Sequence, residues 1–321
     1  MPTSCHDSER HPLAGPAIAA ELRAGLTAGH AAIAPKFLYD ALGSKLFEVI
    51  CELPEYYPTR TEAGIVARHG AEIARTIGPG ATLIDLGAGN CAKAAVLFPL
   101  LHPAQYVAID IAQEFVSEAI AQLRGRFAHI EMTALGLDFS QQLALPGVVR
   151  TAKRLFFYPG SSIGNFTPAQ ALEFLRRARA QCDLDGGLLI GVDLVKDAAV
   201  LDAAYDDALG VTGAFNLNIL RHVNQLLGAD FNVLQWRHLG YFNRAESRIE
   251  MHLEAREALT VRWPGGARAF SKGETIHTEN SYKYRRDDFA GLLGQAGFAP
   301  VQVWTDPNGW FALMYARAVE N

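Results

Sequence analysis

The sequence lacks most of the features that mark secreted, membrane or nucleic-acid-binding proteins. Its four cysteines lie far apart and form no C-x-x-C pair, which indicates reduced thiols of a cytosolic protein. No apolar run approaches the length of a membrane span, and the polar start S-C-H-D-S-E-R-H is unlike a signal peptide. The net charge is −5 and there is no basic block, so nucleic acid and anionic membranes are unsuitable partners. We expect a soluble, cytoplasmic protein.

Metal-binding spacing and repeats are also missing. The ten histidines show neither H-x-x-x-H nor H-E-x-x-H spacing, so we expect no bound metal. There is no internal repeat and no low-complexity tract. What remains is ordinary globular composition, with 50% hydrophobic and 20% charged residues. At 321 residues the chain exceeds the size at which one core usually stops growing, which favours two domains.

The middle of the chain alternates between strand and helix patterns. Such alternation predicts an α/β fold with a parallel, doubly wound sheet. Helices are expected between the strands, and a last helix and an antiparallel hairpin around a D-P-N-G turn close the chain. The strands are expected at 83–86, 105–111, 130–137, 154–158 and 187–195, the last helix at 287–296, and the hairpin at 300–304 and 310–317.

The remaining segments break this rhythm. Helical spacing occurs at 17–28, 35–53, 59–77 and 197–227, with an interruption of the second helix at Gly43 and a turn at 54–58, and strand character occurs at 234–243 and 247–255. We therefore assign 61–196 and 287–321 to one nucleotide-type domain. Residues 8–60 and 197–286 are expected to form a second, discontinuous α+β domain that binds substrate.

A glycine turn after the first strand is the strongest local signal. Residues 81–93 read A-T-L-I-D-L-G-A-G-N-C-A-K, and a strand that runs through glycines into a helix N-terminus is where α/β proteins bind nucleotides. The spacing also fits G-x-G-x-x-A, a dinucleotide motif. Asp85 argues against this interpretation, because its carboxylate would repel a pyrophosphate. The same carboxylate suits a ligand with a cationic end, such as S-adenosylmethionine. A glycine turn without a ligand stays an alternative.

Acidic residues end the next two strands as well. Asp110 lies 23 residues after Gly87, where a carboxylate can accept hydrogen bonds from ribose hydroxyls, with a helix N-cap as the alternative. Asp138 and Phe139 follow the third strand, where a carboxylate and a backbone N–H can meet an adenine ring. Lys93 opens the helix after the glycine turn and could pair with a ligand carboxylate, or be an exposed surface lysine.

Two further segments have the composition of a binding site. Residues 158–166 form an irregular, glycine-rich stretch after a strand, and Asn165 supplies a donor and an acceptor suited to an amino-acid zwitterion, or is an ordinary turn residue. In 278–284, Glu279 and Ser281 are two apart and point to one side of an extended chain, where they could hold a polar ring, although a solvated edge strand is the alternative. Met251 belongs to the apolar side of an alternating strand pattern. This position fits the protein core or, alternatively, the wall of the same site.

Together these motifs resemble a known enzyme family. I-D-L-G-A-G-N-C-A-K, the two acidic strand ends, F-Y-P-G-S-S-I-G-N-F and I-H-T-E-N-S-Y-K-Y are similar to those of the histidine-specific, S-adenosylmethionine-dependent Nα-methyltransferases of ergothioneine biosynthesis. The resemblance runs from F-L-Y-D at 37–40 to the terminal hairpin. It implies a class I methyltransferase domain that is Rossmann-like, with a substrate-binding domain, acting on L-histidine three times to give hercynine.

The resemblance also implies roles for individual residues. Tyr39 and Tyr56 would lie near the amine as catalytic residues, with Tyr39 also touching the cofactor. The cofactor residues would be Asp85, Gly87, Lys93, Asp110, Asp138 and Phe139, and the substrate residues Tyr56, Asn165, Tyr205, Met251, Glu279 and Ser281, with Asn165 and Tyr205 on the carboxylate and Glu279 and Ser281 on the imidazole.

Several alternatives stay open. Related methyltransferases act on tryptophan derivatives, and the chain could be a member of that kind. It could also be a sensor that binds S-adenosylmethionine without turnover, or a nicotinamide oxidoreductase that uses G-x-G-x-x-A, which Asp85 disfavours. We expect a small amino-acid substrate, S-adenosylhomocysteine as the second product, and a monomer.

Overall fold

The computed structural model describes residues 15–140 and 142–320, and these fall into two compact units. The first unit comprises the described part of Met1–Tyr56 with Ala198–Asn243 and Ile249–Asn280. The second comprises Tyr57–Asp197, Arg244–Arg248 and the described part of Ser281–Asn321. Each is described by itself below.

The domain ranges expected from the sequence differ from this division at their boundaries. Residues 57–60, 197, 244–248 and 281–286 were expected in the substrate domain and belong to the second unit. Residues 8–14 of that domain lie outside the described residues, as does Cys5. The division of cofactor and substrate binding between the two ranges stays a prediction.

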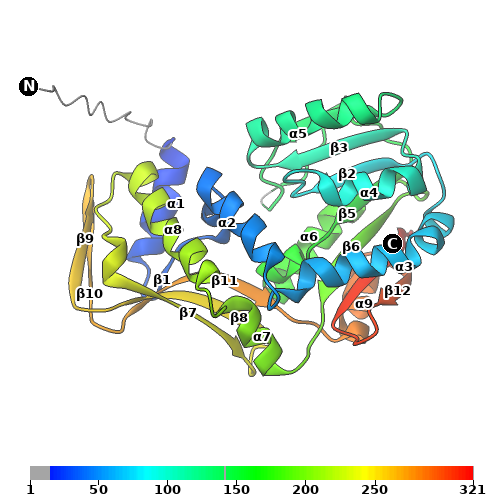
Figure 1. Cartoon of the computed structure of the whole chain (residues 1–321). Coiled ribbons are helices and arrows are strands. Elements are labelled where there is room, and N and C mark those ends of the chain that lie inside the picture. The colour runs from blue at the N-terminus through cyan, green and yellow to red at the C-terminus, as the bar shows by residue number, and fades with distance from the viewer. Residues whose placement is uncertain (1–14, 141, 321) are drawn as a thin grey trace, which may run out of the picture. The chain divides into compact units, whose positions relative to one another are not determined.

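The second unit is built on a seven-stranded sheet (Figure 1) in the order β12-β13-β6-β5-β2-β3-β4. The five neighbouring strands β6, β5, β2, β3 and β4 run parallel to one another. Strand β13 runs antiparallel to both of its neighbours, β6 and β12. This confirms the predicted class I methyltransferase, Rossmann-like sheet with a terminal antiparallel hairpin. The strands are β2 (Thr82–Leu86), β3 (Gln105–Asp110), β4 (Glu131–Gly136), β5 (Arg154–Tyr158), β6 (Gly187–Asp193), β12 (Phe298–Thr305) and β13 (Phe311–Ala318).

Helices cover both faces of this sheet because its strands are apolar on both sides. Ile84 and Leu86 of β2 pack into a core with α6 and α9, whereas Leu83 packs into a second core with α3, α4 and α5. Every residue of β2 is buried. The helices are α3 (Tyr57–Ile77), α4 (Ala92–Leu101), α5 (Gln113–Arg126), α6 (Pro168–Ala180) and α9 (Arg286–Gln295).

The first unit has a smaller sheet in the order β1-β11-β8-β7, with a separate antiparallel hairpin, β9–β10. Its strands are β1 (Ala31–Ala32), β7 (Trp236–Asn243), β8 (Arg248–Ala255), β9 (Leu259–Trp263), β10 (Gly266–Phe270) and β11 (Thr275–Tyr282), of which β8 and β11 continue into the second unit. Its helices are α1 (Pro16–Thr27), α2 (Ala41–Glu52), α7 (Ala198–Tyr205) and α8 (Val211–Leu227), with short 3-10 turns η1 (Pro35–Leu38) and η3 (Val233–Gln235).

Some sequence expectations were wrong in detail. The helix expected at 35–53 breaks at Tyr39 and Asp40 rather than at Gly43, because the Asp40 carboxylate accepts the Gly43 N–H at 2.7 Å and caps α2. Tyr57 and Pro58 begin α3 instead of ending a turn. The helix expected at 197–227 is interrupted between α7 and α8, and the β9–β10 hairpin was not predicted.

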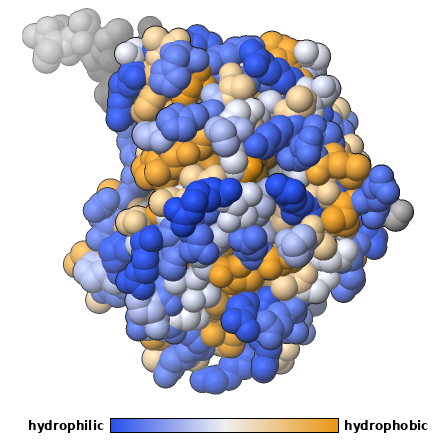
Figure 2. All heavy atoms as spheres, turned by 90° about the vertical axis from the view of Figure 1, so that its right-hand side faces the viewer, coloured by the Kyte–Doolittle hydropathy of each residue, from blue (hydrophilic) through white to orange (hydrophobic). Residues whose placement is uncertain are grey.

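Among the described residues, no helix is both long and apolar enough to cross a membrane. On the face drawn in Figure 2, hydrophobic residues form separate patches among hydrophilic ones. Exposed apolar side chains of this kind are normal for a folded domain.

Candidate functional site

The glycine turn after β2 is held in place by β3. Gly87 and Gly89 have φ of 69° and 52°, which glycine adopts without strain. The Gly87 and Ala88 N–H groups donate to the Ile109 carbonyl at 2.9 and 3.0 Å. The Asp110 carboxylate accepts the N–H groups of Gly89 and Ala112, both at 3.0 Å. Asp110 therefore stabilises the turn. It also lies at the end of β3, where the sequence predicts a contact with the ribose.

Asp85 has an unusual environment. Its carboxyl is buried, and the Tyr106 hydroxyl donates to Oδ2 at 2.8 Å. Oδ1 has no hydrogen-bond partner among the described residues. Burial raises the pKa of Asp85 to about 7, against the opposing effects of Tyr106 and Lys93. A buried acceptor without a donor is costly, so this oxygen fits a ligand that brings a positively charged N–H.

Lys93 is paired with a residue that the sequence analysis did not single out. Its Nζ lies 2.8 Å from Glu62 Oε2, and Glu62 Oε1 accepts the Gly160 N–H at 2.8 Å. A side chain at Gly160 would lie 2.9 Å from that Nζ. Glu62 thus joins α3, α4 and the loop after β5. The available signal was the spacing, because Glu62 lies three residues before Ile65 on the buried face of α3.

Asp138 and Phe139 follow β4. Asp138 Oδ1 accepts from the N–H and hydroxyl of Ser140, so part of this carboxylate already serves a local turn. The Phe139 ring lies edge-on to Tyr158, with centroids 5.7 Å apart. Its Cζ is 3.9 Å from where a Gly87 side chain would begin. The structure therefore brings Phe139 to the glycine turn, as expected for two parts of one nucleotide site.

The loop after β5 lies against the last residues of β11. Asn165 is half-buried at the end of the 3-10 turn η2 (Ser162–Asn165), before Thr167, which caps α6 through a capping box. A side chain on Gly164 would lie 2.9 Å from the Tyr282 carbonyl and 3.4 Å from Ser281 Oγ. The structure thus brings two predicted substrate segments, those of Asn165 and Ser281, close together.

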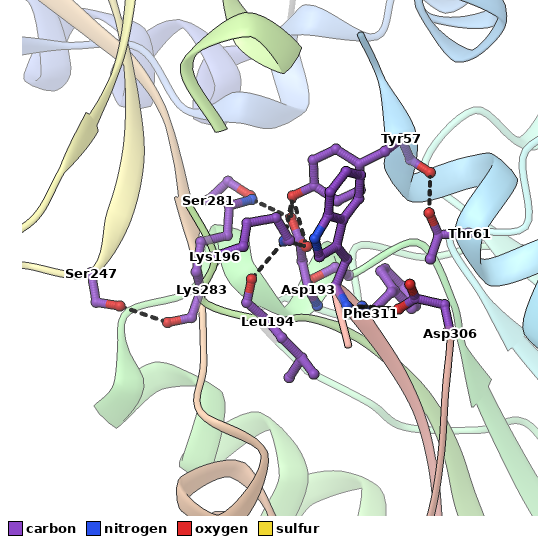
Figure 3. A network of polar contacts seen from close by, with 12 residues as sticks. Tyr57, Thr61, Asp193, Leu194, Lys196, Ser247, Ser281, Lys283, Asp306 and Phe311 are labelled. Carbon is purple, nitrogen blue, oxygen red and sulfur yellow. Dashed lines mark hydrogen bonds and ion pairs between the residues drawn. The ribbon is translucent and has the colours of Figure 1, made fainter. Parts of the chain in front are cut away.

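A buried polar cluster lies at the end of β6 (Figure 3). The Asp193 carboxylate accepts from the Tyr57 hydroxyl at 2.7 Å, from Lys283 Nζ at 2.8 Å and from Lys196 Nζ. Lys283 Nζ also donates to Ser281 Oγ at 2.8 Å. The two lysines lower the pKa of Asp193 against the effect of burial, and burial lowers the pKa of Lys196 to about 8.

The sequence analysis missed this cluster. Two signals were present in the sequence. Asp193 is a fourth acidic residue near the end of a strand, after Asp85, Asp110 and Asp138. Lys283 lies two residues after Ser281, as Ser281 lies two residues after Glu279.

In the first unit, the predicted tyrosines gather around an aromatic cluster. Phe47 lies edge-on to both Tyr39 and Tyr56, at centroid distances of 5.5 and 5.9 Å, and Tyr56 is 6.1 Å from Tyr205. Burial and then the neighbouring Tyr205 raise the pKa of Tyr56 well above its usual value, and Glu279 adds to this. Tyr39, Tyr56, Tyr205 and Glu279 therefore lie in one neighbourhood, and the Tyr56 phenol keeps its proton.

Glu279 and Met251 are both buried on neighbouring strands. Glu279 is 7% exposed on β11, and Met251 is 1% exposed on β8. The Met251 carbonyl accepts from the Thr278 hydroxyl at 3.0 Å. The segment 278–283 is buried apart from Asn280, which is half-buried, so the alternative of a solvated edge strand was wrong. Met251 occupies a core position, and its contact with substrate stays a prediction.

The described part of the chain contains no group of three or more histidine, cysteine, aspartate or glutamate side chains that could hold a metal ion.

Comparisons with known proteins agree with the geometry. The model of a family described as histidine-specific, SAM-dependent methyltransferases matches residues 18–318. A histidine N-alpha-methyltransferase from Mycolicibacterium smegmatis is 40% identical over 94% of this chain and 95% of its own length. One of the same name from Mycobacterium tuberculosis is 37% identical over 94% of each chain. An ergothioneine biosynthesis protein 1 from Neurospora crassa is 30% identical over 88% of this chain and 32% of its own. The chain belongs to the family of histidine-specific, S-adenosylmethionine-dependent methyltransferases.

Proposed function

We propose that this protein transfers methyl groups from S-adenosylmethionine to the α-amine of L-histidine, three times, to give trimethylhistidine (hercynine), the first step of ergothioneine biosynthesis. The observation that carries the choice of substrate is the neighbourhood of Tyr39, Tyr56, Tyr205 and Glu279 in the first unit. Aromatic faces attract a methylated ammonium. A buried carboxylate supplies the acceptor that an imidazole N–H needs.

The residues around the glycine turn fit S-adenosylmethionine. The unpartnered Oδ1 of buried Asp85 would accept from the ammonium of its methionine part. The Asp110 carboxylate would accept from ribose hydroxyls, and Phe139 would lie along the adenine. Bound there, the cofactor supplies a methyl group on a positively charged sulfur. Gly87, Lys93 and Asp138 complete the proposed cofactor set.

The proposed substrate roles follow the family resemblance. In the second unit, Asn165 would bind the substrate carboxylate and Ser281 the imidazole. In the first unit, Tyr205 would bind the carboxylate, Tyr39 and Tyr56 the amine, and Glu279 the imidazole, with Met251 as an apolar wall. Tyr39 would also touch the cofactor.

The protein's task in this reaction is alignment. Positive charge passes from sulfur to nitrogen, so little new charge needs stabilisation, and well-oriented reactants gain on the order of 7–11 kcal/mol. The amine must be neutral to attack. Because the Tyr56 pKa is raised, this phenol would act as a hydrogen-bond partner that orients the amine, and it would not take up the amine's proton.

One experiment tests the proposal directly. Purified protein is incubated with S-adenosylmethionine and each of the twenty amino acids, and mass spectrometry counts the methyl groups added. We expect one, two and three methyl groups on histidine and little on other amino acids. Preferred methylation of tryptophan would favour a tryptophan-type member of the family, and absence of turnover with retained cofactor binding would favour a sensor.

The comparison with the family removes the nicotinamide interpretation of the glycine turn. A monomeric state, a cytoplasmic location and the absence of nucleic-acid partners stay predictions.

A further inference from the structure

A chain of hydrogen bonds inside the first unit connects Tyr205 to β11, and it carries an inference that rests on the proposed function. Tyr205 is the last residue of α7, where the backbone carbonyls lie beyond the hydrogen-bond ladder of the helix. His238 Nε2 of β7 lies 2.8 Å from the Tyr205 carbonyl. A side chain on Gly240 would lie 2.5 Å from the same oxygen, so the glycine lets β7 approach the end of α7 closely.

The end of α7 is held at further places. The Asp202 carboxylate accepts the Phe242 N–H of β7 at 2.6 Å. Two residues after Tyr205, the Asp207 carboxylate accepts two N–H groups at the start of α8, at 3.0 and 2.7 Å. The Tyr205 ring lies edge-on to Tyr56, with centroids 6.1 Å apart. Tyr205 is therefore constrained at its backbone and at its ring.

The hydrogen bonds of Asn216 determine which nitrogen of His238 carries the hydrogen. Asn216 Nδ2 lies 3.1 Å from the His252 carbonyl and 2.9 Å from His238 Nδ1. A carbonyl only accepts, so the amide nitrogen donates to it and gives its other hydrogen to His238. Nδ1 of His238 therefore accepts, and Nε2 donates to the Tyr205 carbonyl. Burial lowers the pKa of His238, which favours this uncharged form of the ring.

Thr278 completes the chain at β11. Its hydroxyl lies 2.7 Å from Asn216 Oδ1 and 3.0 Å from the Met251 carbonyl, and it donates to these two acceptors. Asn216 and Thr278 are both completely buried. Buried polar networks whose members are hydrogen-bonded make a core rigid. The end of α7 is thus joined through α8 to the strand that carries Glu279.

We propose that His238 is a positioning residue, which fixes Tyr205 where it binds the carboxylate of the substrate histidine. Asn216 and Thr278 extend the chain to the residue before Glu279, the proposed partner of the imidazole. One chain of hydrogen bonds, all within the first unit, thus sets the separation between the group that binds the carboxylate and the group that binds the ring. The site then favours an amino acid whose ring and carboxylate have the separation found in histidine.

The test is steady-state kinetics with histidine. The carboxylate takes no part in methyl transfer, so weaker binding of it raises KM and leaves kcat unchanged. We expect His238→Leu to raise the KM for histidine about tenfold, as loss of a hydrogen bond to a charged group does. The KM for S-adenosylmethionine should stay at its wild-type value. His238→Gln keeps an N–H that can reach the Tyr205 carbonyl, and it should restore most of the wild-type KM for histidine.

A double-mutant cycle shows whether His238 acts through Tyr205. Tyr205→Phe removes the hydroxyl and keeps the backbone carbonyl to which His238 donates. If His238 positions this side chain, His238→Leu should raise KM less than about threefold in the Tyr205→Phe protein, against about tenfold in the wild type. A loss of general stability would raise KM equally in both proteins, and equal effects would overturn the inference.

Thr278 provides a second test if His238→Leu does not fold. Thr278→Val keeps the shape of the side chain and removes the hydroxyl, and we expect it to raise the KM for histidine about threefold, as loss of a hydrogen bond between uncharged groups does. This rise should also disappear in the Tyr205→Phe protein. Thr278→Ser keeps the hydroxyl and should keep the wild-type KM.

The control lies in the same helix as Asn216. The Asn224 amide binds the carbonyl and the N–H of Phe231, at 2.8 and 2.9 Å, and takes no part in the chain. Asn224→Ala should therefore keep the wild-type KM. An unchanged KM in a folded His238→Leu or in Thr278→Val would overturn the inference, as would an equal rise in Asn224→Ala. A wild-type protein that neither binds nor methylates histidine would instead contradict the proposed function.

Discussion

At the scale of single residues, the proposed chemistry of this protein depends on buried carboxylates. Among the described residues, Asp85 accepts one hydrogen bond, from Tyr106, and its Oδ1 has no partner. Glu279 is 7% exposed and contributes to the raised pKa of Tyr56. Buried acceptors of this kind bind a donor-bearing ligand more strongly than one without the donor. Their effects should therefore appear in binding constants and in pH profiles.

Asp85 predicts a pH dependence of cofactor binding. Its pKa is raised to about 7, so below that pH the free protein carries a proton that a cationic ligand must displace. An α-amino group stays charged in this range. We expect the affinity for S-adenosylhomocysteine to fall as the pH drops below about 7, by up to tenfold per pH unit. Asp85→Asn should bind more weakly and show a flat profile.

The measurement is calorimetry between pH 5.5 and pH 7. Asp287→Asn is the control, because that side chain is 84% exposed and pairs with Arg286 at 2.9 Å. A flat wild-type profile would exclude Asp85 as the ammonium partner.

Glu279 predicts a loss of histidine binding without loss of the cofactor. A hydrogen bond to a charged group contributes about 1.5–3 kcal/mol, which corresponds to a KM for histidine about ten- to a hundredfold higher in Glu279→Ala. Affinity for S-adenosylhomocysteine should be retained. The control is Glu254→Ala on β8, whose carboxylate pairs with the half-exposed Arg237 at 2.7 Å. An unchanged histidine preference would show that the imidazole is held elsewhere.

At the scale of elements, the sequence predicted what depends on local patterns. The strands β2, β3 and β5 lie within a residue or two of their expected bounds because fully buried strands read as continuous apolar runs between glycine and acidic residues. The glycine turn and its acidic strand ends were predictable for the same reason. The break between η1 and α2 at Tyr39 and Asp40 was not predictable. It depends on the Asp40 carboxylate, which caps α2, and on a close contact made by Gly43.

That contact gives a prediction for Gly43. An added side chain would lie 1.8 Å from the Leu38 carbonyl oxygen, so the backbone of η1 would have to move. Glycine to alanine in a helix normally stabilises by about 0.5–1 kcal/mol. Gly43→Ala should instead destabilise by about 1–3 kcal/mol, as overpacking does.

The control for Gly43 lies in another helix of the same unit. A side chain at Gly213 in α8 would meet His238 at an ordinary 3.5 Å, so Gly213→Ala should stabilise. Urea unfolding of both variants compares the two. A Gly43→Ala protein as stable as wild type would mean that η1 does not pack against this position.

At the scale of the whole molecule, what could not be predicted is long-range. The first unit combines three separate segments, and the chain passes between the units within β8 and β11. The Asp193 cluster likewise joins residues from α3, β6 and the segment after β11. Each of its members is an ordinary side chain in the sequence, and only the tertiary fold shows that two lysines share one carboxylate.

This cluster predicts that Asp193 is essential for stability. Removing its charge leaves two buried ammonium groups together, whereas removing either lysine leaves one balanced pair. Breaking a buried pair in this way costs about 3–5 kcal/mol, so Asp193→Asn should lower the free energy of unfolding by this amount and Lys196→Met by much less. Because the cluster is buried, added salt should not remove the difference. For comparison, the surface pair Arg177–Glu173 on α6, at 2.9 Å, should contribute about 0.3–0.5 kcal/mol.

The pH dependence of stability has a definite sign here. The folded-state pKa of Asp193 lies below its unfolded value of 3.8, so the stabilisation is present above that value and is lost as the pH falls through the folded pKa. Urea unfolding of wild type and Asp193→Asn at successive pH values below 5 should therefore show the two curves approaching each other in acid. A constant difference across that range, or an Asp193→Asn protein as stable as wild type at pH 7, would mean that the carboxylate does not stabilise the two lysines.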